Sequence, residues 1–317
     1  MLAMVLNHPG DANVFDPEDR PIPKATATKS VLKIMAFGIN HAELITRAGG
    51  SPDVHLPRVI GIEAVGVIYE TSANSGLQSN QKVMTLMGGF GRAFDGSYEA
   101  YALVPNDQLY PVESDLSWEA LATIPESFYT AYGSLCKLHL NQGDQLLIRG
   151  GSSSVGLAAL LMAKTLGLQV TVTTRDKTKV TKLRQFGADH VLIDQGELAT
   201  RTQFAGVIEL VGVTTLLDSM RHVKPNGYVV VTGGLGGQWV LPNFSPFSIQ
   251  GYLTNFQSTH VNAGLFQAML ALVAKHHLSL PIIQQFDLAH VGAAHAALEK
   301  PHDLGKIIVI ANTNRVR

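Results

Sequence analysis

The chain has 317 residues, 46% of them hydrophobic and 15% charged, and its formal net charge is −1 at pH 7. This length is typical of two domains of ordinary size. A near-neutral balance without a block of Lys or Arg argues against nucleic acid as a partner, and no apolar run approaches the ~20 residues of a membrane helix. The single cysteine, Cys136, excludes a disulfide framework and a cysteine-rich zinc site. We therefore expect a cytoplasmic protein that binds neither nucleic acid nor membranes.

The first third of the chain predicts a β-rich domain. Short apolar runs are separated by turn residues, a spacing that is typical of a barrel-like fold. The predicted strands cover residues 30–37, 61–70, 82–87 and 97–104.

From Ser117 onward, strands and helices alternate, which indicates a doubly wound parallel sheet of the Rossmann type in an α/β protein. Ser117 has the character of a helix N-cap and leads to a helix over 130–138. The expected strands are 146–149, 169–174, 190–193, 205–210 and 228–232, with a Pro-Asn-Gly turn at 225–227, and the expected helices are 155–166, 177–186 and 214–223.

The C-terminal part predicts two helices, near 263–276 and 290–299, and a final strand over 306–310. That strand does not easily join the parallel sheet. We expect it to complete the N-terminal β-domain, which makes that domain discontinuous.

A dinucleotide-binding turn is the most informative motif. The apolar run 146–148 enters the turn 150–156 (GGSSSVG), and a helical pattern and a second strand follow. Small residues allow a pyrophosphate to approach the backbone, and the helix N-terminus offers free N–H groups and a positive dipole end. Residues expected beside the pyrophosphate are Ser153, Ser154, Val155 and Gly156.

The end of the second strand favours NADP(H). NAD sites usually place Asp or Glu there to bind the ribose 2′-hydroxyl. This chain has Thr174 and Arg175, with Asp176 one residue beyond the usual place and Lys179 further on. Arg and Lys suit a 2′-phosphate through charge-assisted hydrogen bonds. The alternative is that both are solvated surface charges.

Two further turns follow predicted sheet strands at their carboxyl ends, where cofactors bind in this architecture. They contain Val211-Gly212 and Gly233-Gly234. We expect cofactor contact at both, and simple turn geometry is the alternative.

Four segments resemble the medium-chain dehydrogenase/reductase superfamily, and the likeness covers essentially the whole chain. Within it the chain is most similar to the zinc-free quinone oxidoreductase branch. The segments are 61–66 (GIEAVG), 95–101 (DGSYEAY), 124–132 (IPESFYTAY) and 187–191 (GADHV). The resemblance implies a GroES-like β-barrel domain over 1–121 and 255–317, a Rossmann domain over 122–254, and a homodimer formed through an edge strand near 247–252.

The positions that match the catalytic zinc ligands of alcohol dehydrogenases are Asn40, Ile62 and Glu126. An Asn amide is a poor zinc donor and Ile is none, so we expect no metal. The resemblance then implies hydride transfer from NADPH to a quinone or an α,β-unsaturated carbonyl, acceptors that need no Lewis acid. The alternatives are a 2-enoyl-thioester reductase and an NADPH-binding sensor with little turnover.

Three residues carry roles through the resemblance. Asn40 matches a residue that lines the nicotinamide pocket, and Thr130 matches a cofactor-contacting Thr. The alternatives are a loop Asn that bonds its own backbone and a helix-cap hydroxyl. Tyr98 is a candidate proton donor, and a packing tyrosine is the alternative. Reduced quinones can take protons from solvent, so no single side chain need be essential.

Overall fold

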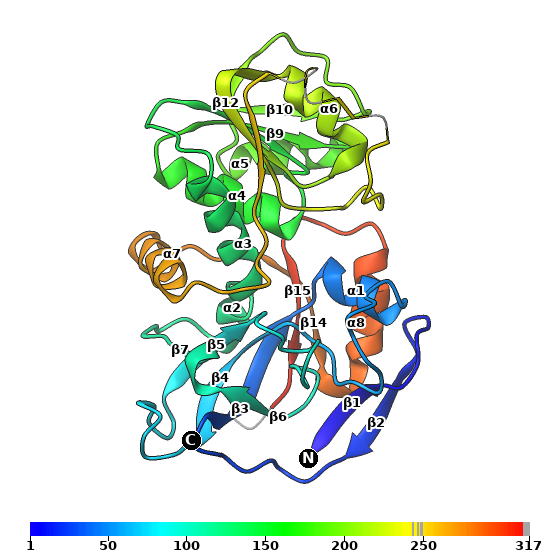
Figure 1. Cartoon of the computed structure of the whole chain (residues 1–317), viewed down its shortest axis with the longest axis vertical. Helices are drawn as coiled ribbons and strands as arrows, with labels where there is room; N and C mark the ends of the chain where they lie inside the picture. Colours follow the sequence, from blue (N-terminus) through cyan, green and yellow to red (C-terminus); the bar gives the residue numbers. More distant parts are fainter. Residues whose placement is uncertain (243, 246, 248–249, 313–317) are drawn as a thin grey trace. The chain divides into compact units, whose positions relative to one another are not determined.

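A computed structural model describes residues 1–242, 244–245, 247 and 250–312. The chain divides into two compact units (Figure 1). Unit 1 comprises Met1–Glu126, Thr259–Phe266 and Ser279–Arg317, and unit 2 comprises Ser127–Ser258 and Gln267–Leu278. The domain boundaries expected near residues 121 and 255 stay a prediction. Among the described residues, no helix is both long and apolar enough to cross a membrane.

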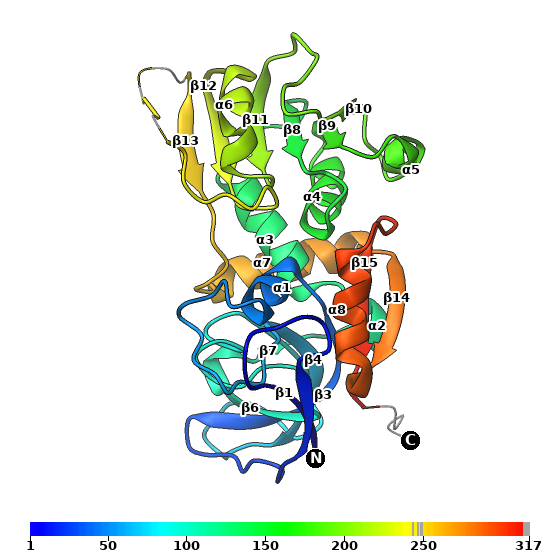
Figure 2. The same cartoon turned by 90° about the vertical axis from the view of Figure 1, so that its right-hand side faces the viewer.

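Unit 2 contains the predicted parallel sheet. Its strands lie in the order β10-β9-β8-β11-β12-β13, every neighbouring pair is parallel, and Figure 2 shows them side by side. The chain moves outward from β8 in one direction and then in the other, which creates a switch point between β8 and β11. The strands are β8 (Gln145–Arg149), β9 (Gln169–Thr174), β10 (His190–Ile193), β11 (Phe204–Glu209), β12 (Val223–Val231) and β13 (Tyr252–Asn255).

Apolar runs fill the centre of this sheet because helices cover it. Leu146, Leu147 and Ile148 are each fully buried. Helices α4 (Ser154–Thr165), α5 (Val180–Gln185) and α6 (Val213–Arg221) pack on the sheet strands. The other helices here are α3 (Pro125–Cys136) and α7 (Ala263–His276), with a 3₁₀ turn, η2 (Lys177–Lys179).

Four element boundaries in this region differ from expectation. Helix α3 begins at Pro125, five residues early, because proline suits the first helical position. Asp176 caps η2, so α5 starts late. The expected Pro-Asn-Gly turn lies inside β12, where the register with β11 shifts. The expected edge strand near 247–252 is instead β13, which starts at Tyr252, and residues 248 and 249 lie outside the described residues.

Unit 1 is β-rich, as expected. Strands β1 (Leu2–Leu6) and β2 (Phe15–Asp19) form an antiparallel pair, and a larger sheet runs β14-β15-β3-β4-β5-β7, with β6 also on β3. The other strands are β3 (Lys29–Gly38), β4 (Glu63–Glu70), β5 (Lys82–Leu86), β6 (Tyr101–Pro105), β7 (Tyr110–Pro111), β14 (Ile282–Asp287) and β15 (Lys306–Ile310). The final strand pairs antiparallel with β3, so the expectation that it joins the N-terminal β-domain is confirmed.

The expected strand 97–104 is shorter in the structure. Strand β6 starts at Tyr101. Before it, the Met4 N–H donates to the Tyr98 carbonyl and the Ala100 N–H donates to the Leu2 carbonyl, so this segment pairs with β1. The helices of unit 1 are α1 (His41–Arg47), α2 (Trp118–Leu121) and α8 (Val291–Glu299), with 3₁₀ turns η1 (Asn106–Gln108) and η4 (Leu288–His290). Ser117 caps α2 as expected, since its Oγ accepts the N–H of Ala120 at 3.3 Å.

Candidate functional site

The turn between β8 and α4 is fixed by backbone and hydroxyl bonds. The N–H groups of Gly150 and Gly151 donate to Oγ1 and to the carbonyl of Thr173, each at 3.0 Å. Ser153 is the N-cap of α4: its Oγ donates to the Gly150 carbonyl at 2.8 Å and accepts the Gly156 N–H at 3.1 Å. The Ser153 hydroxyl therefore shapes the turn, and a phosphate would meet backbone N–H groups of the first helical turn.

Small residues are required here for space. A Cβ on Gly156 would lie 2.4 Å from the Gly150 carbonyl oxygen, and one on Gly151 would lie 2.6 Å from Cβ of Val172. Strand, turn and helix thus pack as closely as a dinucleotide-binding unit demands. The residues present fit a dinucleotide pyrophosphate at this helix N-terminus.

The carboxyl end of β9 presents an exposed cation and an acid with one of its two oxygens hydrogen-bonded. Thr174 is buried, and its Oγ1 accepts the N–H of Asp176 at 3.1 Å. The Asp176 carboxylate accepts from both the N–H and the Oγ1 of Thr178, at 2.9 and 2.6 Å, and these bonds lower its pKa. Arg175 is exposed and makes no ion pair with the described residues, and Lys179 is half-buried. The Arg175 guanidinium is thus available to a ligand, whereas Asp176 uses Oδ1 for its own turn and has Oδ2 without a hydrogen bond among the described residues.

The turn after β11 is organised by a buried carboxylate. Glu209 is fully buried, and its Oε1 accepts the N–H groups of Val211 and Gly212, at 2.8 and 3.0 Å. Burial raises the pKa of Glu209. Gly212 has φ of +98°, a conformation that favours glycine, and a Cβ there would lie 2.9 Å from the Gly233 carbonyl oxygen. The predicted turns at Gly212 and Gly233 are therefore in contact at one edge of the sheet.

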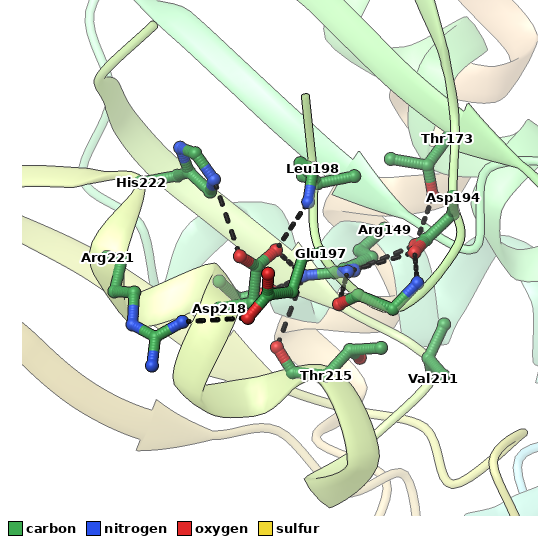
Figure 3. Close-up of polar contacts among 12 residues, drawn as sticks. Arg149, Thr173, Asp194, Glu197, Leu198, Val211, Thr215, Asp218, Arg221 and His222 are labelled. Carbon is green, nitrogen blue, oxygen red and sulfur yellow. Dashed lines mark hydrogen bonds and ion pairs between the residues drawn. The ribbon is translucent and has the colours of Figure 1, made fainter. Parts of the chain in front are cut away.

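Arg149 connects these turns and was not predicted from the sequence. It is fully buried at the end of β8, between two carboxylates (Figure 3). Its Nε and Nη2 donate to Asp194 at 2.8 and 2.9 Å, and its Nη1 donates to Asp218 at 2.6 Å. Asp194 also accepts the Oγ1 of Thr173, which holds Gly150. A charged residue at the end of an apolar strand was the only available signal.

The same network reaches the second turn through Ser219. Arg149 Nη1 donates to the Ser219 hydroxyl at 3.2 Å, and that hydroxyl donates to Glu209 Oε2 at 2.5 Å. One chain of hydrogen bonds therefore runs from the Gly150 turn to the Gly212 turn.

In unit 1, the half-buried Asn40 belongs to a polar cluster whose other members are buried. It is the N-cap of α1, forms a capping box with Glu43, and donates from Nδ2 to Oε1 of Glu63 at 2.8 Å. Glu63 Oε1 also lies 2.5 Å from Lys306 Nζ, and both side chains are fully buried. We define Asn40, Glu43, Glu63 and Lys306 as the buried polar cluster. Asn40 is therefore more than a loop residue that bonds its own backbone, because the Glu63 carboxylate of β4 orients its amide.

The two carboxylates of the cluster accept backbone N–H groups from all three positions that match zinc ligands. Glu43 accepts the N–H groups of Asn40 and Ile62, at 3.0 and 3.2 Å, and Glu63 Oε2 accepts the N–H of Glu126 at 2.8 Å. Burial, with the nearby Glu63 second, raises the pKa of Glu43 to about 8. Within the described residues, no group of three His, Cys, Asp or Glu side chains is placed to hold a metal ion.

Tyr98 and Thr130 occupy buried positions. The Tyr98 ring is fully buried and stacks on Phe37 at 5.1 Å, and its hydroxyl lies 2.7 Å from Nε2 of His295. This environment favours the packing alternative. Thr130 lies inside α3, not at its start, so the helix-cap alternative is wrong. Its carbonyl accepts the Ser134 hydroxyl at 2.7 Å.

Comparison with known proteins places the chain in a family. Residues 26–114 match the model of the alcohol dehydrogenase GroES-like domain, and residues 186–309 match a model described as zinc-binding dehydrogenase. The chain belongs to the medium-chain dehydrogenase/reductase superfamily, and its relatives are consistent with the zinc-free quinone oxidoreductase branch.

Three relatives illustrate the range of named activities. A quinone oxidoreductase of Pongo abelii is 28% identical over 87% of this chain and 86% of its own. An acryloyl-coenzyme A reductase of Metallosphaera sedula is 22% identical over 90% and 93% of the two chains. A mitochondrial enoyl-acyl-carrier-protein reductase of Rattus norvegicus is 27% identical over 80% and 72%. The chain is an oxidoreductase of this superfamily.

Two solved structures share the fold. The quinone oxidoreductase of Coxiella burnetii has a TM-score of 0.85 at 24% identity and covers 98% of this chain and 99% of its own. A mycobacterial protein complexed with NADPH has a TM-score of 0.84 at 22% identity, over 98% and 100%. At these identities the two structures show the shared fold. The turns described above and the quinone oxidoreductase relative support a nicotinamide cofactor.

Proposed function

We propose that the protein is a zinc-independent, NADPH-dependent reductase of quinones or α,β-unsaturated carbonyls. One observation carries the cofactor choice: at the end of β9, Arg175 is exposed without an ion pair among the described residues, while Asp176 lies one residue beyond the usual acid position. A 2′-phosphate suits the guanidinium, and the usual position of the acid that binds a 2′-hydroxyl is taken by Thr174 and Arg175.

The proposed cofactor contacts follow the three turns of unit 2 and helix α3. When bound, NADPH supplies the hydride that adds to the electrophilic carbon of the acceptor. The chain's own residues bind and orient the dinucleotide through backbone N–H groups and through Arg175. The proposed cofactor-binding residues are Thr130, Ser153, Ser154, Val155, Gly156, Thr174, Arg175, Lys179, Val211, Gly212, Gly233 and Gly234.

Zinc independence rests on the donor set. Of the positions that match zinc ligands, Ile62 has no donor atom, and Asn40 has its amide nitrogen bonded to Glu63. We propose that Asn40, oriented in this way, binds the nicotinamide carboxamide or the substrate oxygen. Quinones and enones delocalise the incoming charge, so this weaker polarisation is sufficient. Tyr98 is not required in this scheme, and the acceptor takes its proton from solvent.

The second candidate is a 2-enoyl-thioester reductase, because the acryloyl-coenzyme A and enoyl-acyl-carrier-protein reductases are relatives of similar identity. An enoyl thioester is also an activated alkene, so the same residues would serve. The third is an NADPH-binding sensor. We further propose a cytoplasmic homodimer that pairs through β13, which lies at the edge of the parallel sheet.

The test is NADPH and NADH oxidation by chelator-treated protein with quinones, enones and an enoyl thioester. Turnover of quinones or enones with NADPH well above NADH supports the proposal, and turnover of the thioester alone favours the second candidate. Tight NADPH binding with no turnover indicates the sensor. Activity that requires added zinc contradicts metal independence, and equal use of NADH contradicts the role of Arg175.

A further inference from the structure

A pair of hydroxyl groups connects helix α3 to the residue that follows strand β12. Ser134 Oγ donates to the carbonyl of Thr130, one helical turn earlier, at 2.7 Å, and it lies 2.8 Å from Oγ1 of Thr232. Ser134 is fully buried, whereas Thr232 is half-buried. All three residues belong to unit 2, and neither Ser134 nor Thr232 is among the residues proposed above for the cofactor.

The direction of these hydrogen bonds follows from the number of protons. A backbone carbonyl only accepts and a serine hydroxyl has one proton, so Ser134 uses that proton for the Thr130 carbonyl. The bond between the two hydroxyl groups is therefore donated by Thr232 to Ser134. Thr232 then has no proton left, and its Oγ1 makes no other hydrogen bond with the described residues. Towards a ligand, Thr232 Oγ1 is an acceptor and not a donor.

Thr232 lies where the nicotinamide half of a dinucleotide is expected. Its N–H donates to the Glu209 carbonyl at 3.0 Å, and it directly precedes the Gly233 turn. In the strand order β9-β8-β11-β12, the proposed adenosine end lies at β9, and the pyrophosphate turn follows β8 (Figure 2). A dinucleotide that crosses the switch point therefore places its nicotinamide half at the carboxyl ends of β11 and β12.

Close packing fixes α3 against this end of the sheet. A Cβ on Gly133 would overlap the ring of Phe256, the residue that follows β13. The N–H of Phe256 donates in turn to the carbonyl of Val231, the last residue of β12, at 3.2 Å. The helix that holds Ser134 and the strand that precedes Thr232 are thus in direct contact, which keeps the two hydroxyl groups within hydrogen-bond distance.

We propose that Thr232 Oγ1 accepts a hydrogen bond from the carboxamide N–H of the bound nicotinamide. Ser134 is then the positioning residue that makes Thr232 an acceptor. The carboxamide is the one group on the nicotinamide ring that has N–H donors, and an acceptor of fixed direction selects its amino group over its carbonyl. This inference rests on the proposed function as far as a nicotinamide cofactor is concerned. It does not depend on the choice between NADPH and NADH, which share the carboxamide.

The test compares NADPH with its reduced 3-acetylpyridine analogue, in which a methyl ketone replaces the carboxamide and no N–H remains. Calorimetric titration of the full chain gives both dissociation constants, and we expect the parent to bind NADPH more tightly. Thr232→Val keeps the shape and removes the hydroxyl, so it should weaken NADPH binding about threefold to tenfold. Binding of the analogue should not weaken. Thr232→Ser keeps the hydroxyl and should retain the preference of the parent.

Ser134→Ala tests the positioning role. The variant keeps the Thr232 hydroxyl but removes the group to which it donates, so Thr232 becomes free to donate to the ketone of the analogue. The variant should therefore bind the analogue more tightly than the parent does, an effect that a loss of stability does not produce. Thr165→Val is the control, since that hydroxyl bonds the Met162 carbonyl at 2.7 Å at the last residue of α4. It should change neither dissociation constant.

The inference is overturned if Thr232→Val weakens NADPH and the analogue equally, which would indicate a ribose contact or a structural role, or if it weakens neither. If the parent binds neither NADPH nor NADH, the proposed function fails together with this inference. If NADPH binds and is oxidised but both variants keep the preference of the parent, only the inference fails. Should Thr232→Val not fold, Ser134→Ala still decides, because unchanged affinity for the analogue contradicts the fixed direction.

Discussion

Glu63 Oε1 lies 2.5 Å from Lys306 Nζ, and neither side chain is exposed to solvent. The pair joins the first residue of β4 to the first residue of β15, which are 243 positions apart in the chain. Glu63 also fixes the Asn40 amide and the N–H of Glu126. A single buried carboxylate thus orients two of the three positions at which alcohol dehydrogenases bind zinc.

Replacement of Lys306 should destabilise unit 1 strongly. Lys306→Met leaves the Glu63 carboxylate buried without its counter-ion, which typically costs about 3–5 kcal/mol in the free energy of unfolding. The double variant Lys306→Met/Glu63→Gln should recover part of this loss. Urea unfolding measures both, and Lys24→Met, at an exposed position, is the matched control. A loss below about 1 kcal/mol in Lys306→Met would show that the pair contributes little.

The proton on Glu43 should make stability depend on pH. The pKa of Glu43 is raised to about 8 from 4.5, so the folded state binds more protons than the unfolded state between these values. The contribution of Glu43 is therefore fully present below about pH 4.5 and is lost as the pH rises through 8, with a slope of about 1.4 kcal/mol per pH unit at most. Urea unfolding at pH 5.5, 6.5 and 7.5 should give a flatter profile for Glu43→Gln. Identical slopes in the two proteins would contradict the assignment.

Tyr98→Phe should affect stability and leave turnover intact. The change removes the hydroxyl that lies 2.7 Å from Nε2 of His295, a ring whose pKa is lowered to about 3, mainly by burial. A buried nitrogen left without a partner typically costs about 1–3 kcal/mol. Thermal unfolding and steady-state NADPH oxidation measure the two effects. Lost turnover with normal stability and normal NADPH binding would make Tyr98 the proton donor.

The pattern of strands and helices was readable from the sequence because it is local. Alternating apolar runs and helical periods predicted the parallel sheet, and the leftover strand at 306–310 was assigned to the β-domain because it had no place in that sheet. Boundaries moved where capping decided them, as at Pro125 and Asp176.

The buried ion pairs could not be predicted from the sequence in the same way. Lys306 and Arg149 are end residues of apolar strands, but their partners Glu63, Asp194 and Asp218 come from distant segments. A buried charge is recognised only when its partner is known, because Lys and Arg are otherwise surface residues. One sequence without an alignment does not reveal such pairs.

Arg149 should control cofactor affinity without touching the cofactor. Arg149→Met leaves Asp194 and Asp218 buried without their shared cation, and we expect a loss of about 3–5 kcal/mol in the free energy of unfolding. Arg149→Lys keeps the charge but not the set of hydrogen bonds that joins the Gly150 and Gly212 turns. This variant should fold and bind NADPH more weakly, as followed by the cofactor's fluorescence. Arg221→Met, at an exposed ion pair with Glu197, is the control. Unchanged NADPH affinity in folded Arg149→Lys would limit Arg149 to stability.

Arg175 should set the choice between the two dinucleotides. Arg175→Ser removes an exposed guanidinium beside the Thr174 turn without leaving a buried partner, so stability should not change. If Arg175 binds the 2′-phosphate, the lost charge-assisted bond of about 1.5–3 kcal/mol corresponds to roughly a tenfold to hundredfold higher Kd for NADPH. The Kd for NADH should stay the same, since NADH has no such phosphate. Lys177→Ser, two residues further along the same turn and also exposed, is the control. An equal rise in Kd for NADPH and for NADH would mean that Arg175 supports the turn and does not bind the 2′-phosphate.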